Sequence, residues 1–477
     1  MTISHTEKQN RFYGDTNNLL QNHDSINKEN LVRYEFEQKI DHFNSLDTRY
    51  FNQSFYINDE FYEPGGPIWF VCHGETRSYP ELIQKSEKQN FVVELVQETK
   101  GMVVLVELRY YGNSTLFSSL EESNIKYFSI DQILEDFATF MKTVDLNKYS
   151  KKIQPQKQNQ NKWIYFGASF SASLGQWLRI KYPDIVYAAY TSSGSVEAEF
   201  DYYQSDITLL SALPCAKGLS SAVKLIDAVF ESPMSNSSLV DEATKVSAFP
   251  LTKIKIKELF GFENVKNDAD FLYLISVLVT QLVQTNEPDD NGNLSNIDTF
   301  CKEIDGSKTS LENIFGYAAY VRNKKNEGFE AQESSSIVEE KKKSVKRQVN
   351  GLKNDGVSRS LFGFDNSIYG PKPWLYLTCN EIGTFPTSAA LHGHPYSSRS
   401  TQLSVDYYMD QCTRWFGIDW GNTNLNRTNK VYFGKNATID RRTLYVEGNL
   451  DPTFWSSVVS NVYFEKKNEI DYENGME

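Results

Sequence analysis

Several features that decide a protein's class are missing from this sequence, and long apolar runs are the first. No stretch approaches about 18 consecutive apolar residues, so we expect no segment that spans a membrane. A surplus of basic residues is missing too, because 62 acidic residues outnumber 49 Lys and Arg residues and the net charge is −13. Nucleic acids and anionic membranes bind basic surfaces, so we expect neither as a partner.

The N-terminus lacks the apolar segment that is typical of a signal peptide. Residues 1–30 are polar throughout, which taken alone favours a cytosolic protein. Asn-x-Ser/Thr sequons point instead to the secretory route, although an Asn-rich chain produces several by chance. These candidate glycosylation sites are Asn52, Asn113, Asn236, Asn293, Asn426 and Asn436.

Closely spaced cysteine pairs are also absent. The cysteines are Cys72, Cys215, Cys301, Cys379 and Cys412, and none of them lies in a Cys-x-x-Cys motif. The sequence therefore does not indicate a zinc site or a thioredoxin-type site. Two alternatives remain: buried reduced thiols, or two disulfides that leave Cys72 over in a strand. Spacing alone does not choose between them.

What the sequence does have is apolar material for a sizeable core. Its 477 residues are 40% hydrophobic and 14% aromatic, which fits one large domain with an insertion or two domains. Short runs rich in β-branched and aromatic residues predict buried strands at 67–73, 101–111, 162–169 and 441–451. Helical patterns lie between them, at 130–144 and 171–183. This alternation predicts an α/β fold with a mainly parallel sheet.

The middle of the chain has a different pattern. From about residue 200 to residue 370 helical patterns dominate, as at 221–231 and 268–284. The run 323–356 is charged and nearly free of apolar residues, which predicts a solvated helix or a disordered loop. We therefore divide the chain into a polar tail (1–30), a first α/β part (31–199), a helical insertion (200–370) and a second α/β part (371–477).

A serine stands where one predicted strand gives way to a helix. The sequence there, "YFGASFSASLGQW" (165–177), nearly matches the Gly-x-Ser-x-Gly nucleophile elbow, with Ser171 in place of the second glycine. Such an elbow needs small residues two positions before and after the nucleophile, because they meet closely at the turn. Gly167 and Ser171 meet that need, so Ser169 is a candidate nucleophile. The alternative is an ordinary small residue in a strand-to-helix turn.

A nucleophilic serine needs donors for an oxyanion and an acid that orients its base. The following helix supplies the N–H of Phe170, and the loop 72–75 offers Gly74 as a second donor. In α/β hydrolases the acid and then the histidine follow the serine along the chain. Asp451, in a turn held by a proline after the last predicted strand, is the candidate acid. The alternative is that Asp451 only begins a turn, because Asn-Leu-Asp-Pro is a sequence that is common in turns.

These motifs, with others, resemble the serine carboxypeptidase family that includes lysosomal Pro-Xaa carboxypeptidase, dipeptidyl-peptidase II and the thymus-specific serine peptidase. Eight segments resemble blocks of that family, in order, over most of the chain. His73 replaces the first glycine of the family's Gly-Gly-Glu loop. The segments are "QKIDHFN" (38–44), "GGPIWFVCHGE" (65–75), "VELRYYGNS" (106–114), "YFSIDQILEDFATFM" (127–141), "GASFSASLGQWLRIKYPDIVYAAYTSSGSV" (167–196), "WLYLTCNEIGTFPT" (374–387), "DYYMDQCTRWFG" (406–417) and "EGNLDP" (447–452).

The resemblance implies an α/β-hydrolase domain with a helical cap, in a secreted, lysosomal or vacuolar protein. It implies a serine exopeptidase, either a carboxypeptidase or a dipeptidyl-peptidase, that removes residues next to proline from peptides. By position, Ser169 takes the role of nucleophile and Asp451 that of the acid. The resemblance also implies two disulfides, Cys379–Cys412 and Cys215–Cys301, which would leave Cys72 free.

The two exopeptidase classes differ in the charged peptide terminus that they bind. Glu75 and Glu381 are candidates for binding a substrate amine, and the alternative for each is a structural ion pair. The sequence does not decide which class applies. An esterase on the same scaffold is a further alternative, because a fold does not determine the substrate.

The histidine that such a serine needs is missing after Asp451. The histidines of the chain are His5, His23, His42, His73, His392 and His394. Without an imidazole, the serine has no proton acceptor. Three explanations are open: the sequence stops short of the base, the protein is an inactive homologue that binds peptides, or His392 or His394 substitutes. The His-x-His spacing of the last two also suggests a metal, but no further ligands cluster nearby, so we expect no metal or other cofactor.

Overall fold

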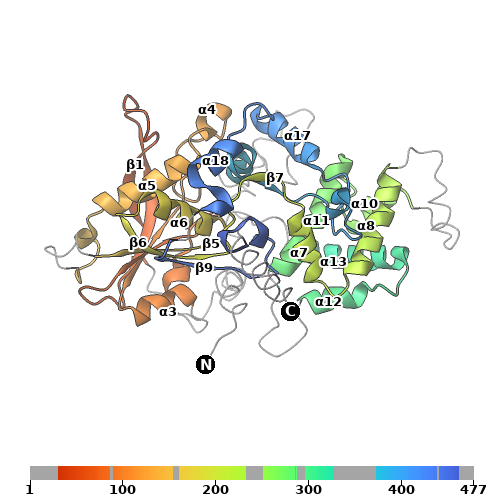
Figure 1. The fold of residues 1–477 in the computed structure, drawn as a ribbon, viewed down its shortest axis with the longest axis horizontal. Coiled ribbons are helices and arrows are strands. Elements are labelled where there is room, and N and C mark those ends of the chain that lie inside the picture. Colours follow the sequence, from red (N-terminus) through yellow and green to blue (C-terminus); the bar gives the residue numbers. More distant parts are fainter. Residues whose placement is uncertain are drawn as a thin grey trace, which may run out of the picture.

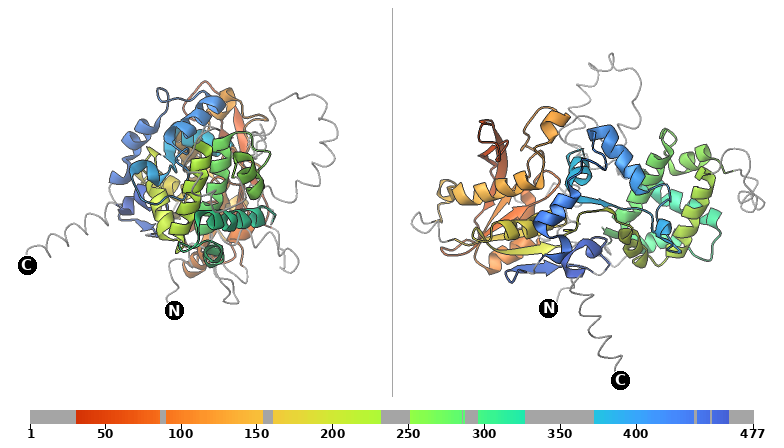
Figure 2. Two further views of the ribbon diagram at one scale, coloured as in Figure 1. Left: turned by 90° about the vertical axis from the view of Figure 1, so that its right-hand side faces the viewer. Right: turned by 45° about the horizontal axis from the view of Figure 1, so that its top comes forward.

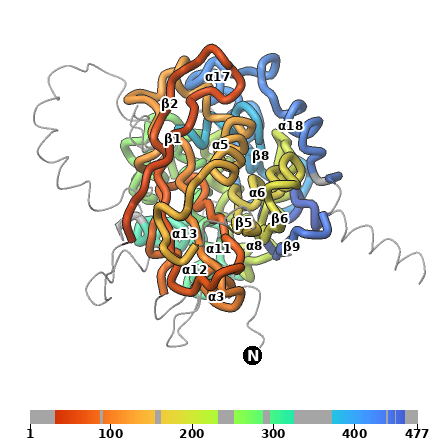
Figure 3. Tube along the Cα trace, turned by 90° about the vertical axis from the view of Figure 1, so that its left-hand side faces the viewer, coloured from red at the N-terminus to blue at the C-terminus, as the bar shows by residue number. Residues whose placement is uncertain are grey.

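A seven-stranded sheet forms the core of one lobe of the molecule (Figure 1). The computed structural model describes residues 31–85, 90–153, 161–231, 251–284, 286, 296–326, 372–437, 440–448 and 450–460. Within these residues the strand order is β1-β2-β4-β3-β5-β6-β9. The pairings from β4 through β9 are parallel, and β1 and β2 add an antiparallel edge, which Figure 3 shows in front of the cap helices.

The four predicted strand runs each contain a strand of this sheet. These strands are Ile68–Cys72 (β3), Met102–Val106 (β4), Trp163–Ala168 (β5) and Thr443–Val446 (β9). Three strands were not predicted: Tyr34–Lys39 (β1), Tyr50–Asn58 (β2) and Val186–Ser192 (β6). β1 and β2 mix polar and apolar residues near the edge of the sheet, and β6 is rich in small residues. None of the three therefore shows the continuous apolar run that marks a strand covered on both faces.

Helices cover both faces of the sheet, and β3 shows how. Phe70 packs into the cluster that includes residues of Ile130–Thr143 (α5) and Phe170–Lys181 (α6). Its neighbours Trp69 and Val71 point to the other face, against Phe91–Glu98 (α3). Both predicted helices, at 130–144 and 171–183, are confirmed as α5 and α6. The alternation explains the unbroken apolar sequence of the strand, because each face of a strand is buried under a helix layer.

A lobe of helices lies beside the sheet, inserted between β6 and β9 (Figure 2). The predicted helices at 221–231 and 268–284 are confirmed within α8 and α11. The charged run 323–356 lies almost wholly outside the described residues. The helices of this cap are Gln204–Ser211 (α7), Ala216–Glu231 (α8), Lys253–Phe260 (α10), Asp268–Gln284 (α11), Asn296–Glu303 (α12) and Ser310–Asn326 (α13).

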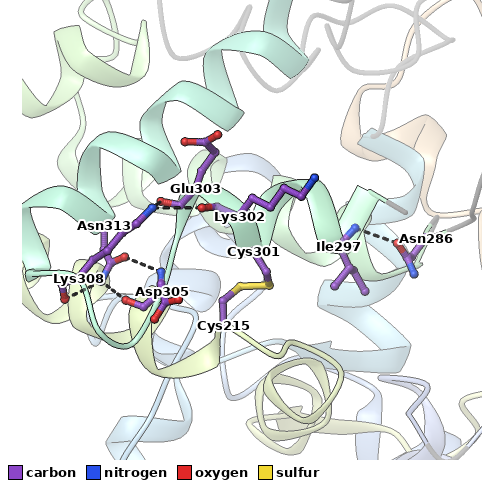
Figure 4. Close-up of a disulfide and its surroundings, with 9 residues drawn as sticks. All are labelled: Cys215, Asn286, Ile297, Cys301, Lys302, Glu303, Asp305, Lys308 and Asn313. Atoms are coloured by element: carbon purple, nitrogen blue, oxygen red, sulfur yellow. Dashed lines mark hydrogen bonds between the residues drawn. A yellow bond between two sulfur atoms is a disulfide. The ribbon is translucent and has the colours of Figure 1, made fainter. Parts of the chain in front are cut away.

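A disulfide between Cys215 and Cys301 joins the start of α8 to α12 (Figure 4). Next to it, the Lys308 ammonium donates hydrogen bonds to two carbonyl oxygens at the end of α12. The amide of Asn313 donates to the Asp305 carbonyl, 2.9 Å away, and so closes the turn into α13. Both pairings implied by the family resemblance are confirmed, since Cys379 bonds to Cys412 and Cys72 is free and buried.

The chain returns from the cap along the sheet lobe before it enters β9. A short parallel pair, Glu199–Asp201 (β7) with Gly383–Phe385 (β8), links the two lobes. Helices Lys372–Leu377 (α16), Thr378–Ile382 (η4, a π-helix), Val405–Phe416 (α17) and Leu425–Tyr432 (α18) follow the cap. Short helical turns lie at Pro80–Ile83 (η1), Glu122–Ile125 (α4), Leu146–Lys148 (η2), Ala389–His392 (η5), Gly434–Asn436 (η6) and Phe454–Ser456 (η7).

Helix α18 packs against the sheet lobe. The Tyr432 hydroxyl donates a hydrogen bond to Asp131 of α5, 2.7 Å away, and its ring lies 5.4 Å from that of Trp177 in α6. Residues 371–442, which we assigned to the second α/β part, thus add no strand to the seven-stranded sheet among the described residues. The parallel sheet with its helical insertion makes this an α/β-hydrolase fold. No helix in the described ranges is long and apolar enough to cross a membrane.

Candidate active site

Ser169 makes the whole turn between strand β5 and helix α6. β5 ends at Ala168 and α6 begins at Phe170, so one residue reverses the direction of the chain. Its backbone angles are φ 54° and ψ −130°, a conformation that residues other than glycine rarely adopt. The N–H of Ser169 donates to the carbonyl of Ser192 in β6, 2.8 Å away, and this bond helps to hold the turn. Strain of this kind concentrates at functional sites, and it is the geometry of a nucleophile elbow.

The two small residues around Ser169 do meet. A Cβ atom added to Gly167 would lie 2.5 Å from the Ser171 hydroxyl oxygen. That hydroxyl donates to the carbonyl of Cys72, 2.7 Å away, and lies 2.8 Å from the hydroxyl of Tyr165. Ser171 therefore fits where the motif has glycine, because its buried hydroxyl has partners and ties α6 to the ends of β3 and β5.

We expect Gly167→Ala to destabilise the protein by about 1–3 kcal/mol, since the new methyl group overpacks the elbow. The backbone of Ser171 is as close as its hydroxyl, so a side-chain rotation does not relieve the clash. Urea unfolding measures the loss. Gly306→Ala is the matched control, because its Cβ meets only the flexible Lys217 side chain at 3.4 Å. Equal stability of the two variants would contradict the close contact seen here.

The N–H of Phe170 is available to an oxyanion. It is the first N–H of α6 and bonds to no acceptor among the described residues. The helix N-terminus also favours a negative charge there. Gly74 lies beside the elbow and has φ 92°. A Cβ atom added to Gly74 would lie 3.9 Å from Ser171. The N–H of Gly74, however, faces the Cys72 thiol, so the structure does not place it as the second donor.

The Asp451 turn lies at the same edge of the sheet as Ser169. β9 pairs with β6 and β6 pairs with β5, all in parallel, so the carboxyl ends of these strands are aligned. The N–H of Asp451 donates to the carbonyl of Gly448, 3.0 Å away. The N–H and hydroxyl of Thr453 both donate to Oδ1 of Asp451, at 2.9 and 2.7 Å. These bonds hold the carboxylate in one orientation.

No hydrogen bond joins a described histidine to Ser169. An imidazole nitrogen of His42 forms a hydrogen bond with Asp136, 2.7 Å away. An imidazole nitrogen of His73 forms one with the Thr76 hydroxyl, 2.5 Å away. His392 bonds to Asp201, 2.9 Å away, and its ring stacks on Tyr203, while His394 bonds to the carbonyl of Tyr396. The structure does not support the idea that His392 or His394 substitutes as the base, because neither ring forms a hydrogen bond with Ser169. His5 and His23 lie outside the described residues.

Comparison with known proteins identifies the family of this chain. A family model for serine carboxypeptidase S28 matches residues 38–470. The chain belongs to the serine carboxypeptidase S28 family. A serine protease of Bipolaris victoriae is 28% identical over 90% of this chain and 78% of its own length. The thymus-specific serine protease of Homo sapiens is 24% identical over 87% of this chain and 75% of its own length. The lysosomal Pro-X carboxypeptidase of Bos taurus is 32% identical over 37% of this chain and 34% of its own length.

Glu381 of this S28 chain has a structural partner. The residue is only 5% exposed, and its carboxyl group accepts a hydrogen bond from the N–H of Ile130, 2.8 Å away, at the first turn of α5. Burial raises the pKa of Glu381 to about 7. The contact favours the structural alternative over the binding of a substrate amine, because it caps a helix inside the protein.

Glu75 has a different environment, close to the elbow. It is partly buried beside Tyr111, and no hydrogen bond joins its side chain to another described residue. Burial raises the pKa of Glu75. The ring of Phe170, next to Ser169, packs 5.1 Å from that of Trp374. The Glu75 carboxyl group near the elbow therefore has no hydrogen-bond partner among the other described residues.

One polar residue of this site was missed by the sequence analysis. Glu447 directly follows β9, and its Oε1 accepts a hydrogen bond from the N–H of Gly194, 2.8 Å away. Burial and the nearby charge of Asp451 raise the pKa of Glu447 well above its ordinary value. The signal in the sequence was a charged residue at the end of an apolar strand run, but its burial depends on the loop after β6.

The sequons that the structure describes lie at the surface. Asn52, Asn113, Asn426 and Asn436 are exposed. Asn236 and Asn293 lie outside the described residues. Exposure is required of a glycosylation acceptor, so these four sites stay predictions that the structure permits.

Proposed function

We propose that this S28 protein is a serine exopeptidase that cleaves peptides next to proline, with Ser169 as the nucleophile and Asp451 as the acid. The observation that carries the proposal is the strained turn at Ser169, at the sheet edge that also holds the Asp451 turn. The family assignment supports peptide cleavage. The preference for proline is supported by the name of the bovine relative, a Pro-X carboxypeptidase.

The chemistry follows from the positions of these groups. The Ser169 oxygen attacks the peptide carbonyl while its proton passes to an imidazole that Asp451 orients. The N–H of Phe170 stabilises the oxyanion, and the loop at Gly74 supplies the second donor. The amine product leaves with the proton, and water then hydrolyses the acyl-enzyme and frees Ser169. No described residue supplies the imidazole.

The two disulfides support a site of action outside the cytosol. Disulfides persist in oxidising compartments, and Cys215–Cys301 and Cys379–Cys412 each join separate helices. The exposed sequons agree with passage through the secretory route. We propose a secreted, lysosomal or vacuolar location for the protein.

The test of the proposed function is hydrolysis of short peptides that contain proline, with free termini or with the amine acetylated or the carboxyl group amidated. Cleavage next to proline that needs one free terminus supports an exopeptidase of the corresponding class. Hydrolysis of simple acyl esters without any peptide product would indicate an esterase instead. Peptide binding without turnover would indicate a catalytically inactive homologue that binds peptides.

Glu75→Gln tests whether Glu75 binds the amine of the peptide. We expect KM for peptides with a free amine to rise by about tenfold, since a hydrogen bond to a charged group contributes about 1.5–3 kcal/mol. Acetylated peptides should show no change in KM. Glu121→Gln is the matched control, because Glu121 is exposed at the start of α4. An equal effect on both kinds of peptide would show that Glu75 does not bind the amine.

A further inference from the structure

Glu447 connects the Asp451 loop to the helix that carries the elbow. One of its oxygens accepts the N–H of Gly194, 2.8 Å away, across the end of β6. Gly194 in turn packs on the first turns of α6, where an added Cβ would lie 3.2 Å from Ala172 and 2.4 Å from the amide nitrogen of Gln176. These neighbours carry no charge. Glu447 thus reaches from the loop of the acid to the back of the nucleophile helix.

The second oxygen of Glu447, Oε2, is buried and has no hydrogen-bond partner among the described residues. A buried carboxylate oxygen without a donor is costly, but a protonated oxygen is itself a donor and needs only an acceptor. The Thr453 hydroxyl lies beside Glu447 and already donates to Asp451. Its oxygen can accept a hydrogen bond at the same time.

The negative charge of Asp451 also favours a protonated Glu447. Asp451 lies four residues after Glu447 and is also an acid. Among the described residues, it is the group whose charge acts on Glu447. Two like charges in one partly buried loop repel, so one carboxyl group keeps its proton. Asp451 accepts hydrogen bonds at its Oδ1 from the N–H and the hydroxyl of Thr453, whereas Oε2 of Glu447 has no donor among the described residues. The proton therefore belongs on Glu447.

We propose that Glu447 is a positioning residue that keeps a proton at neutral pH and donates it, as a hydrogen bond, to the Thr453 hydroxyl, which donates to Asp451. The proposal rests on the proposed function, in which Asp451 orients the catalytic imidazole. Through this relay the two carboxyl groups hold a single negative charge, and that charge stays on Asp451. When Glu447 ionises, the relay loses its donor and the loop gains a second buried charge.

Stability as a function of pH tests the proton directly, without any catalysis. Glu447 has a raised pKa in the folded protein, so ionisation costs stability as the pH rises from about 4.5 through the folded pKa. Glu447→Gln keeps the shape and a neutral donor. We expect urea unfolding to show that the variant gains stability relative to the wild type as pH rises, with the smallest difference below about pH 4.5. A difference that does not change with pH would overturn the proposal.

Infrared spectroscopy at neutral pH gives a second readout. We expect a protonated carboxyl band in the wild type that Glu447→Gln lacks. Glu381→Gln is the matched control, because Glu381 is also a buried glutamate with a raised pKa but lies at the start of α5. The control should lose a different band and leave that of Glu447 in place. The proposal is wrong if the Glu447→Gln spectrum equals that of the wild type.

The effect on catalysis separates this proposal from the proposed function. We expect kcat/KM of Glu447→Gln to match that of the wild type at low pH. As the pH rises, we expect the value of the variant to exceed that of the wild type. If neither protein hydrolyses any peptide, the proposed function fails, while the unfolding and infrared measurements still decide where the proton lies. If the two proteins hydrolyse peptides with the same pH profile, Glu447 does not position Asp451.

Discussion

Ser169→Ala is expected to lower the rate of peptide hydrolysis by about 10³-fold or more, because it removes the atom that attacks the carbonyl. The stability of the protein should change by less than about 0.5 kcal/mol, since the Ser169 hydroxyl has no hydrogen bond among the described residues and the turn is held by backbone groups. The measurement is hydrolysis of a peptide that contains proline, together with urea unfolding of the same preparation.

Ser173→Ala is the matched control for this prediction. Ser173 lies one helical turn after Ser169, is buried, and donates from its hydroxyl to the carbonyl of Ser195, 2.6 Å away. We expect its loss to cost about 1 kcal/mol of stability and to leave the rate within a few-fold of the wild type. The pair of variants therefore separates catalysis from packing. A Ser169→Ala protein that still hydrolyses peptides at the wild-type rate would remove Ser169 from the mechanism.

Asp136→Ala is expected to cost about 3–5 kcal/mol of unfolding free energy, the largest loss that we predict for one residue, because it leaves a buried cation without its partner. Asp136 and Arg109 are fully buried, and the guanidinium donates two hydrogen bonds to the carboxylate, at 2.6 and 2.7 Å. His42 lies 2.7 Å from the same carboxylate. Arg109 also donates to backbone carbonyls of the segment before β2, so this cluster holds the N-terminal edge of the sheet to α5.

The comparison for Asp136 is a pair of opposite charges at the surface. Glu63 and Lys100 lie 2.8 Å apart, with side chains 61% and 62% exposed. We expect Glu63→Gln to cost less than about 1 kcal/mol, because water solvates both charges and the ordering of two long side chains offsets the attraction. Chemical unfolding of both variants at neutral pH measures the contrast. Similar losses in the two variants would mean that Arg109 finds another partner when Asp136 is removed.

The departures of this chain from its family's motifs are compatible with a working elbow. Ser171 replaces a glycine, yet its hydroxyl has two partners and the turn at Ser169 keeps its strained conformation. His73 replaces a glycine in the loop before Gly74, and burial lowers the pKa of its imidazole to about 4, so it is neutral at physiological pH. Neither change places a new charge beside Ser169.

The sequence by itself determined the parts of this protein that depend on short, local patterns. Strands β3 and β4 are continuous apolar runs that are buried throughout, and β5 and α6 are separated by a serine among small residues. Both patterns are local, because a strand covered on both faces must be apolar throughout and a tight elbow admits only small neighbours. Ser169 and Asp451 could therefore be proposed as nucleophile and acid from the sequence alone.

Only the tertiary structure decided the features that depend on contacts between distant segments. Strands β1 and β2 have mixed sequences, and they are strands because β2 pairs with β4 and β1 pairs with β2. The sequence left Glu381 with two alternatives, an amine-binding group or a structural one, and the hydrogen bond from the N–H of Ile130, 251 residues away, favours the structural one. Glu447 has a raised pKa because the loop after β6 and Asp451 surround it. Burial and charge arise from the whole fold, so no local pattern contains them.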